Sequence, residues 1–80
     1  MEKRIGTITI LIRDREVSLS VNQILSEHAD IILCRQGLPF HDRPVAVISL
    51  IVEGCVNQIN ALTGPLGRLP GITCKAVLAS

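Results

Sequence analysis

Aromatic side chains are almost missing from this 80-residue sequence, which has one phenylalanine and neither tryptophan nor tyrosine. Proteins that bind single-stranded nucleic acids stack bases on aromatic side chains, and this chain lacks such a platform. Charge is also scarce, because only 19% of the residues are charged, the net charge is +1 and the basic residues form no cluster. The electrostatic footprint of a phosphate-binding surface is therefore missing too, and we expect no direct binding to nucleic acid.

Long apolar runs are missing as well. The longest, residues 45–52, is interrupted by Ser49 and is far shorter than the roughly 20 residues that a membrane-spanning helix needs. Residues 1–4 are mostly charged and lead directly into a strand-like pattern, unlike a signal peptide. The three cysteines are widely spaced and odd in number, which favours reduced thiols. We expect a cytoplasmic protein with no membrane partner.

Apolar residues, by contrast, make up 48% of the chain, which excludes a disordered tail. The length is typical of one domain, and no segment has the composition of a linker. We therefore expect a single domain over residues 1–80. A chain of this size buries only about 60% of the surface that its unfolded form exposes, so it would be marginally stable alone.

Six segments have the hydrophobic periodicity of regular secondary structure. Alternation with period two predicts strands, and steps of three and four residues predict helices. Asp14 is a predicted N-cap for the first helix, and Gly64-Pro65 predicts a kink or restart in the second. The elements are a strand at 5–12, a helix at 17–28, strands at 31–38 and 45–52, a helix at 56–66 and a strand at 72–79.

This order predicts an α+β, ferredoxin-like βαββαβ fold. Right-handed crossovers place strands 5–12 and 45–52 in the middle of an antiparallel sheet of order 4-1-3-2. Both helices must cover the same face of that sheet. The predicted core contains Ile8, Ile10, Ile12, Ile48, Leu50 and Val52 from the sheet and Val21, Ile24, Leu25, Ile59, Leu62 and Leu66 from the helices.

The opposite sheet face is also rich in apolar side chains. A monomer rarely exposes an apolar patch larger than a few hundred Å², and symmetric self-association is the commonest way to cover one. We therefore expect a homodimer or homotetramer, with Arg35 and Lys75 toward the sheet edges. The predicted interface contains Thr7, Thr9, Leu11, Leu33, Val47, Ser49, Ile51 and Val77.

Catalytic and metal-binding patterns are not found. Cys34, Cys55 and Cys74 form no Cys-x-x-Cys pair, and we interpret them as small buried hydrophobes. His28 and His41 have no partner at ligand spacing, so Cys34 with His41 would be the candidates only if two subunits shared a metal. The sequence has no Ser-His-Asp set, no Walker-type loop and no paired carboxylates. We therefore expect no catalytic residues, no cofactor and no enzyme.

Three segments carry a family resemblance: Val-Asn-Gln-Ile-Leu at 21–25, Arg-Gln-Gly-Leu-Pro at 35–39 and Ala-Leu-Thr-Gly-Pro-Leu-Gly-Arg-Leu-Pro-Gly at 61–71. They resemble the small iron-only hydrogenase system regulators over essentially the whole chain. That family is similar in fold to amino-acid-binding ACT domains and to the C-terminal domain of the nickel-responsive repressor. Pro65 departs from the family pattern, and the repressor's nickel ligands are not matched.

The resemblance implies an oligomeric, ACT-like regulatory domain of the iron-only hydrogenase system that senses a small ligand or a protein partner. No helix-turn-helix or ribbon arm precedes the first strand, so an effect on transcription would need a partner. ACT-like dimers place their ligand where the first strand and helix meet the neighbouring subunit. That position implies a ligand site of Arg13, Asp14, Arg35, Gly37 and His41.

Two alternatives remain open. The first is a structural or accessory subunit that binds other proteins during metalloenzyme maturation and takes no small molecule. The second, less favoured, is an enzyme that uses Cys34 or His41.

Overall fold

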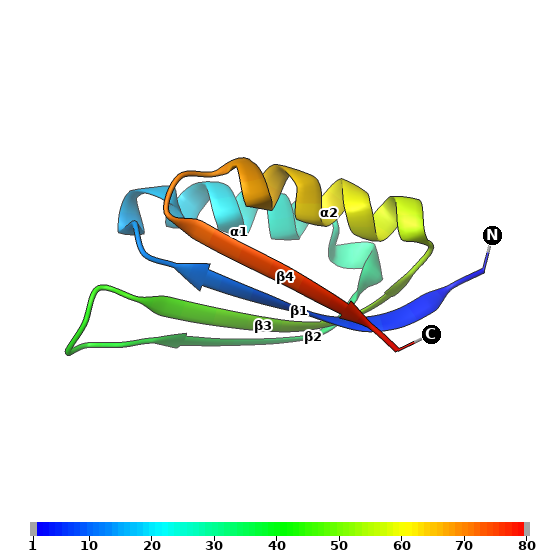
Figure 1. The fold of residues 1–80 in the computed structure, drawn as a ribbon, viewed down its shortest axis with the longest axis horizontal. Helices are drawn as coiled ribbons and strands as arrows, with labels where there is room; N and C mark the ends of the chain where they lie inside the picture. Colours follow the sequence, from blue (N-terminus) through cyan, green and yellow to red (C-terminus); the bar gives the residue numbers. More distant parts are fainter. Residues whose placement is uncertain (1, 80) are drawn as a thin grey trace.

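The computed structural model describes residues 2–79, in which four strands form one antiparallel sheet with helices on one of its faces (Figure 1). Residues 1 and 80, the ends of the predicted domain, lie outside the described residues. Short 3₁₀ turns, Arg15–Val17 and Ala29–Ile31, flank the first helix. The main elements are β1 (Arg4–Ile12), α1 (Ser18–Glu27), β2 (Ile32–Pro39), β3 (Ala46–Gly54), α2 (Val56–Arg68) and β4 (Ile72–Leu78).

The sheet has the strand order β2-β3-β1-β4, which is the predicted order read from the other edge. The ferredoxin-like βαββαβ fold is therefore confirmed. β1 pairs with β3 on one side and with β4 on the other, and Ile10 lies opposite both Ile48 and Cys74. The β-branched residues of the central strands favour this extended, pleated backbone.

The core lies between the sheet and the two α-helices, as the periodicity predicts. Alternate residues of β1 and β3 point toward the helices because the side-chain period of a strand is two. Every predicted core residue except Ile24 is buried, and Ile24 packs against the core while partly exposed. The structure adds Val17 and Ile31 to the core, one from each 3₁₀ turn.

The β1–α1 connection is held against the α2–β4 turn. Asp14 caps the 3₁₀ turn that precedes α1, because its Oδ1 accepts a hydrogen bond from the Glu16 backbone N–H at 3.0 Å. The Arg13 backbone N–H donates to the Gly71 carbonyl oxygen at 2.8 Å. Gly71 has a φ of 72°, a left-handed conformation that favours glycine.

The predicted restart at Gly64-Pro65 is wrong, because α2 runs from Val56 to Arg68 with Pro65 inside it. A kink at this point stays a prediction. A proline normally pushes the preceding residue out of the helical region through a clash with that residue's Cβ. Gly64 has no Cβ, so it keeps helical geometry before Pro65. The Arg68 side chain also donates to the Gly64 carbonyl oxygen at 3.3 Å, one turn from the end of the helix.

The molecule is elongated, with principal dimensions of 42 × 18 × 17 Å. The hairpin of β2 and β3 accounts for part of this length, because its loop, green in Figure 1, reaches past the start of α1. Within residues 2–79 no helix is both long and apolar enough to cross a membrane.

Gly6 tests how closely the central strand β1 packs against the edge strand β4. A Cβ at this position would lie 2.7 Å from both the Val77 carbonyl oxygen and the Leu78 Cδ2 atom. We expect Gly6→Ala to lower the free energy of unfolding by about 1–3 kcal/mol through overpacking, which is roughly 4–8 °C of melting temperature per kcal/mol for a domain of this size. Thermal unfolding followed by circular dichroism measures the shift.

Gly67→Ala is the matched control, because no atom lies within 4 Å of a Cβ built on Gly67 in α2. There the same substitution should stabilise the protein by up to about 1 kcal/mol through helix propensity. A Gly6→Ala variant that melts at or above the temperature of the parent would contradict the observed β1–β4 packing.

Candidate functional site

The sheet face that turns away from the helices, here the open face, consists of three rows of side chains that cross all four strands. The register of the strands defines these rows. The outer rows are mainly apolar, and the middle row is polar. In the order β2, β3, β1, β4 the rows are Cys34, Ile51, Thr7 and Val77; then Gln36, Ser49, Thr9 and Lys75; then Leu38, Val47, Leu11 and Thr73.

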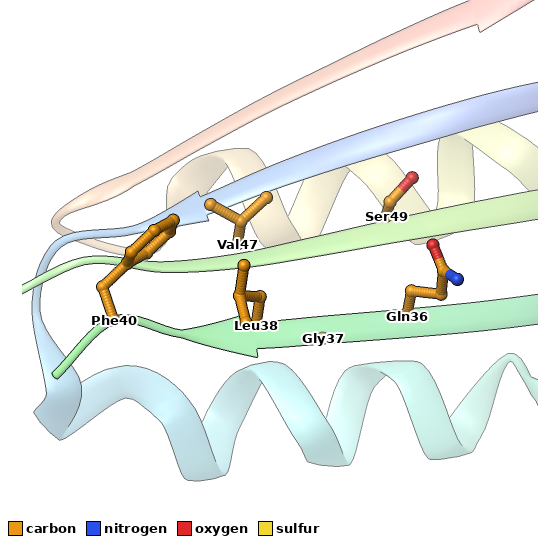
Figure 2. A pocket seen from close by; sticks show the side chains of 6 residues that line it. All are labelled: Gln36, Gly37, Leu38, Phe40, Val47 and Ser49. Atoms are coloured by element: carbon orange, nitrogen blue, oxygen red, sulfur yellow. The ribbon is translucent and has the colours of Figure 1, made fainter.

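Large apolar side chains of the open face are in contact with solvent. Val77 is 68% exposed, Leu38 is 58% exposed and Ile51 is 42% exposed. A hollow of about 460 Å³ lies at the hairpin end of this face, between β2 and β3. Figure 2 shows Leu38, Phe40 and Val47 gathered toward the hairpin loop, while Gln36 and Ser49 lie further along the strands.

The hairpin loop that borders this hollow is held by local contacts. The Phe40 N–H donates to the Val45 carbonyl oxygen at 3.1 Å. The Arg43 guanidinium lies 5.1 Å from the centre of the Phe40 ring and 3.5 Å from the Asp42 carboxylate. The Arg15 side chain reaches the Phe40 carbonyl oxygen at 3.4 Å, which ties the loop to the β1–α1 connection.

The β2 part of the predicted open face differs from the structure. A register irregularity between Ile32 and Cys34 inserts Leu33 into β2 and changes the phase of the strand. Leu33 is still 61% exposed. Arg35 lies opposite the buried Leu50, so its expected place on the open face is wrong.

Cys34, Gln36 and Leu38 take the open-face positions of β2 instead. The period-two prediction missed them because a bulge leaves no sequence signal when it contains neither glycine nor proline.

A second groove, of about 260 Å³, lies on the helix side between α1 and β2. Ile12 and Ile48 contribute to its apolar wall, and Ser18, Asn22 and Arg35 are its polar residues. The Arg35 guanidinium donates a hydrogen bond to the Asn22 side-chain oxygen. Gly37, two residues after Arg35 on β2, also lines the groove. A Cβ at Gly37 would meet only Ile48 Cγ1, at 4.0 Å.

The structure brings together two of the five predicted ligand-site residues, Arg35 and Gly37, which line this helix-side groove. Arg13 and Asp14 line neither groove. The Arg13 guanidinium donates to Thr73 Oγ1 at 2.7 Å, and Asp14 caps its own turn. His41 is exposed in the hairpin loop. Sequence reasoning missed Ser18 and Asn22, which look like ordinary polar positions of an amphipathic helix.

The cysteines lie apart on three different elements. Cys34 is exposed on the open face, because the bulge in β2 turns it outward, and Cys55 and Cys74 are only partly buried. The expectation that all three would be buried is therefore wrong. Cys55 precedes α2, and its backbone N–H donates to Gln58 Oε1 at 2.9 Å. Cys74 lies on the helix side of β4. Among residues 2–79 no group of three or more His, Cys, Asp or Glu side chains could hold a metal ion.

His28 has a structural contact at the end of the first helix. His28 Nδ1 lies 2.9 Å from the Ile24 carbonyl oxygen one turn earlier, so the ring lies against the C-terminal turn of α1. No charged or polar residue among residues 2–79 is fully buried.

Burial raises the pKa of the Cys74 thiol above its ordinary value of 9.0. A raised pKa leaves less thiolate at a given pH, and the thiolate is the form that reacts. We expect native Cys74 to react with iodoacetamide more slowly than the same residue in urea-unfolded protein, with its rate rising at higher pH. Peptide mapping by mass spectrometry measures both rates. Equal rates in the two states would contradict the packing of Cys74 against the core.

The comparisons with known proteins agree with this geometry. The family model "TM1266-like: Iron-only hydrogenase system regulator, putative" matches residues 4–76. The structure of the uncharacterized protein TM1266 from Thermotoga maritima is similar to this chain, with 35% sequence identity and a TM-score of 0.92, covering 99% of this chain and 100% of that one. No curated protein matches the sequence.

More distant structures share the fold alone. An unknown protein from Galdieria sulphuraria is 14% identical with a TM-score of 0.66, covering 99% of this chain and 46% of that one. CutA1 from Oryza sativa is 16% identical with a TM-score of 0.56, covering 96% of this chain and 81% of that one. The family match and the 35% identity over the full length decide the assignment: this chain belongs to the TM1266-like family of iron-only hydrogenase system regulators.

Proposed function

We propose that this chain is a non-catalytic regulatory subunit of the iron-only hydrogenase system that acts as a homo-oligomer in the cytoplasm. The open face is its self-association surface, and the binding of a small effector changes the assembly. The observation that carries the proposal is the open face itself, in which one polar row lies between two mainly apolar rows. A sheet face with this composition is unusual for a monomer in water.

The size of the open face supports a dimer. Four strands of seven to nine residues span a flat area of roughly 500 Å², given strand spacings of about 4.8 Å and a rise of about 3.3 Å per residue. Two copies would together cover about 1,000 Å², which is near the lower bound for a specific interface.

The arrangement of the three rows is self-complementary. If one sheet stacks on another through a two-fold axis parallel to the strands, each row lies over the same row of the second copy, with β2 above β4 and β3 above β1. Gln36 of one copy then faces Lys75 of the other, and the central Ser49 and Thr9 hydroxyls face each other. The apolar rows meet apolar rows, as in aligned sheet packing. A two-fold interface requires this matching of a surface with itself.

A regulatory role fits the remaining features of the described chain. With a net charge of +1 and no basic cluster, neither α-helix has the electrostatic footprint of a DNA-recognition helix. The effect of the protein therefore passes through its assembly and its partners. In the accessory-subunit alternative, the same open face would bind a different protein.

Ile51→Glu tests self-association, because it places a charge in an apolar row of the open face. We expect the parent to have a mass that is a multiple of 8.7 kDa and the variant to be monomeric, since an unpaired charge cannot be buried at an interface without a large penalty. Size-exclusion chromatography with light scattering measures both masses.

Leu19→Glu is the matched control, because Leu19 is 80% exposed on α1, away from the open face. This variant should keep the assembly of the parent. A monomeric parent would overturn the self-association proposal and favour the accessory-subunit alternative. An Ile51→Glu protein that remains assembled would place the interface elsewhere.

Cys34 provides an independent reporter, because it lies in the same row as Ile51. In the assembled parent we expect iodoacetamide to modify Cys34 slowly, and in Ile51→Glu we expect faster modification of the exposed thiol, measured at a pH high enough that the new carboxylate opposite Cys34 does not limit thiolate formation. Peptide mapping after a short exposure measures the difference, with Cys55 as the internal reference. Equal Cys34 rates in the two proteins would show that the open face is not covered in the parent.

A further inference from the structure

Gly37 occupies a strand position where the fold has no need of glycine. Its backbone has an ordinary negative φ, since Gly71 is the one residue with a positive φ in the described chain. A Cβ at Gly37 would make a single contact, at 4.0 Å from Ile48 Cγ1. Glycine inside a strand weakens it and often marks a place where a ligand approaches the backbone closely. The missing side chain leaves open the groove between α1 and β2.

Only one of the polar residues that line this groove is charged. Arg35 is its cation, and Ser18 and Asn22 are neutral. Among residues 2–79 no carboxylate pairs with Arg35, whose guanidinium donates to the Asn22 side-chain oxygen. That bond fixes the guanidinium plane while leaving further N–H groups of the fork for a ligand, because arginine has five N–H donors. A planar guanidinium can donate two parallel N–H hydrogen bonds to the two oxygens of one carboxylate.

The other wall of the groove is apolar, with Ile12 and Ile48 as examples. The volume of about 260 Å³ is slightly below the range of roughly 300–1,000 Å³ for drug-sized ligands. The groove therefore has room for a small molecule and not for a nucleotide. An apolar wall beside one cation selects a ligand with an anionic end and a short apolar chain.

We infer that the helix-side groove binds a small aliphatic carboxylate, with the carboxylate on Arg35 and the apolar chain over Gly37 against Ile12 and Ile48. This inference rests on the proposed function, because it names the chemical class of the effector. Gly37 and Leu38 border both this groove and the hollow of the open face, so the ligand lies directly across β2 from the association surface.

Titration of the ¹⁵N-labelled full chain with isovalerate, followed by the backbone amide resonances, tests the inference. We expect saturable shifts at Asn22, Arg35 and Gly37. Isoamyl alcohol, which has the same branched chain without the charge, should give no saturable shift. Inorganic phosphate, an anion without an apolar chain, should bind more weakly than isovalerate. The absence of a saturable isovalerate shift, or equal binding of the alcohol or of phosphate, would overturn the assignment.

Three variants address the two halves of the site. Arg35→Gln should raise the Kd for isovalerate at least about 10-fold, because it removes a charged hydrogen-bond donor. Gly37→Val should abolish binding by filling the groove, while raising the melting temperature, since valine favours strands and glycine weakens them. Gly37→Ala, whose Cβ has no close contact, should fold in any case and should weaken binding. Unchanged affinity in Arg35→Gln or Gly37→Ala would contradict the inference.

Gly67→Ala, which changes a glycine on α2 with open space around it, is the control and should bind like the parent. Light scattering on the same samples separates this inference from the proposed function. Binding by a protein that is monomeric would support the groove and overturn the role in assembly. Assembly without any isovalerate binding would overturn the groove and leave the self-association proposal intact.

Discussion

The antiparallel pairing of β1 with β3 is the interaction on which the rest of the molecule depends. Its register runs without interruption from Arg4 opposite Gly54 to Ile12 opposite Ala46. This pairing puts Ile8, Ile10, Ile48 and Leu50 under the helices and their alternate neighbours on the open face. A one-residue slip would exchange the two faces completely. The core and the open face are therefore set by the same register, and a change of that register would alter both.

β2 is the strand where this simple alternation fails, and the failure has two consequences. The bulge at Leu33 turns Arg35 toward α1, where it meets Asn22. The same shift brings Gln36 and Leu38 onto the open face and completes two of its three rows. Without the extra residue, the register that starts at Ile32 opposite Val52 would place Arg35 opposite Ser49 on the open face, away from Asn22. The bulge thus shapes both the groove and the open face.

Most of the fold follows from sequence, because periodicity reports the burial of alternate residues and burial dominates here. The strands, the sheet order and almost all of the core are predictable from the spacing of isoleucine, leucine and valine. The failures lie where geometry depends on neighbours distant in sequence. The predicted restart at Pro65 does not occur, because Gly64 lacks a Cβ and keeps helical geometry before the proline. The phase of β2 depends on pairing with β3, and the groove exists only where α1 lies beside Gly37.

The position of β2 would couple the proposed ligand groove to the proposed self-association surface. As an edge strand, β2 is paired along one side only, so fewer backbone bonds restrain it than restrain β1 or β3. A ligand shifts an equilibrium only by its difference in affinity between two states. A carboxylate that bridges Arg35 to α1 would favour the twist of β2 that keeps Arg35 beside Asn22. Gln36 and Leu38, one residue from Gly37 on either side, would move with that twist and change the fit of the open face to its partner. Gly37 weakens β2, and its missing side chain is what would let the proposed ligand reach the strand. The strand is therefore least stable at the position where the proposed regulation needs it to move.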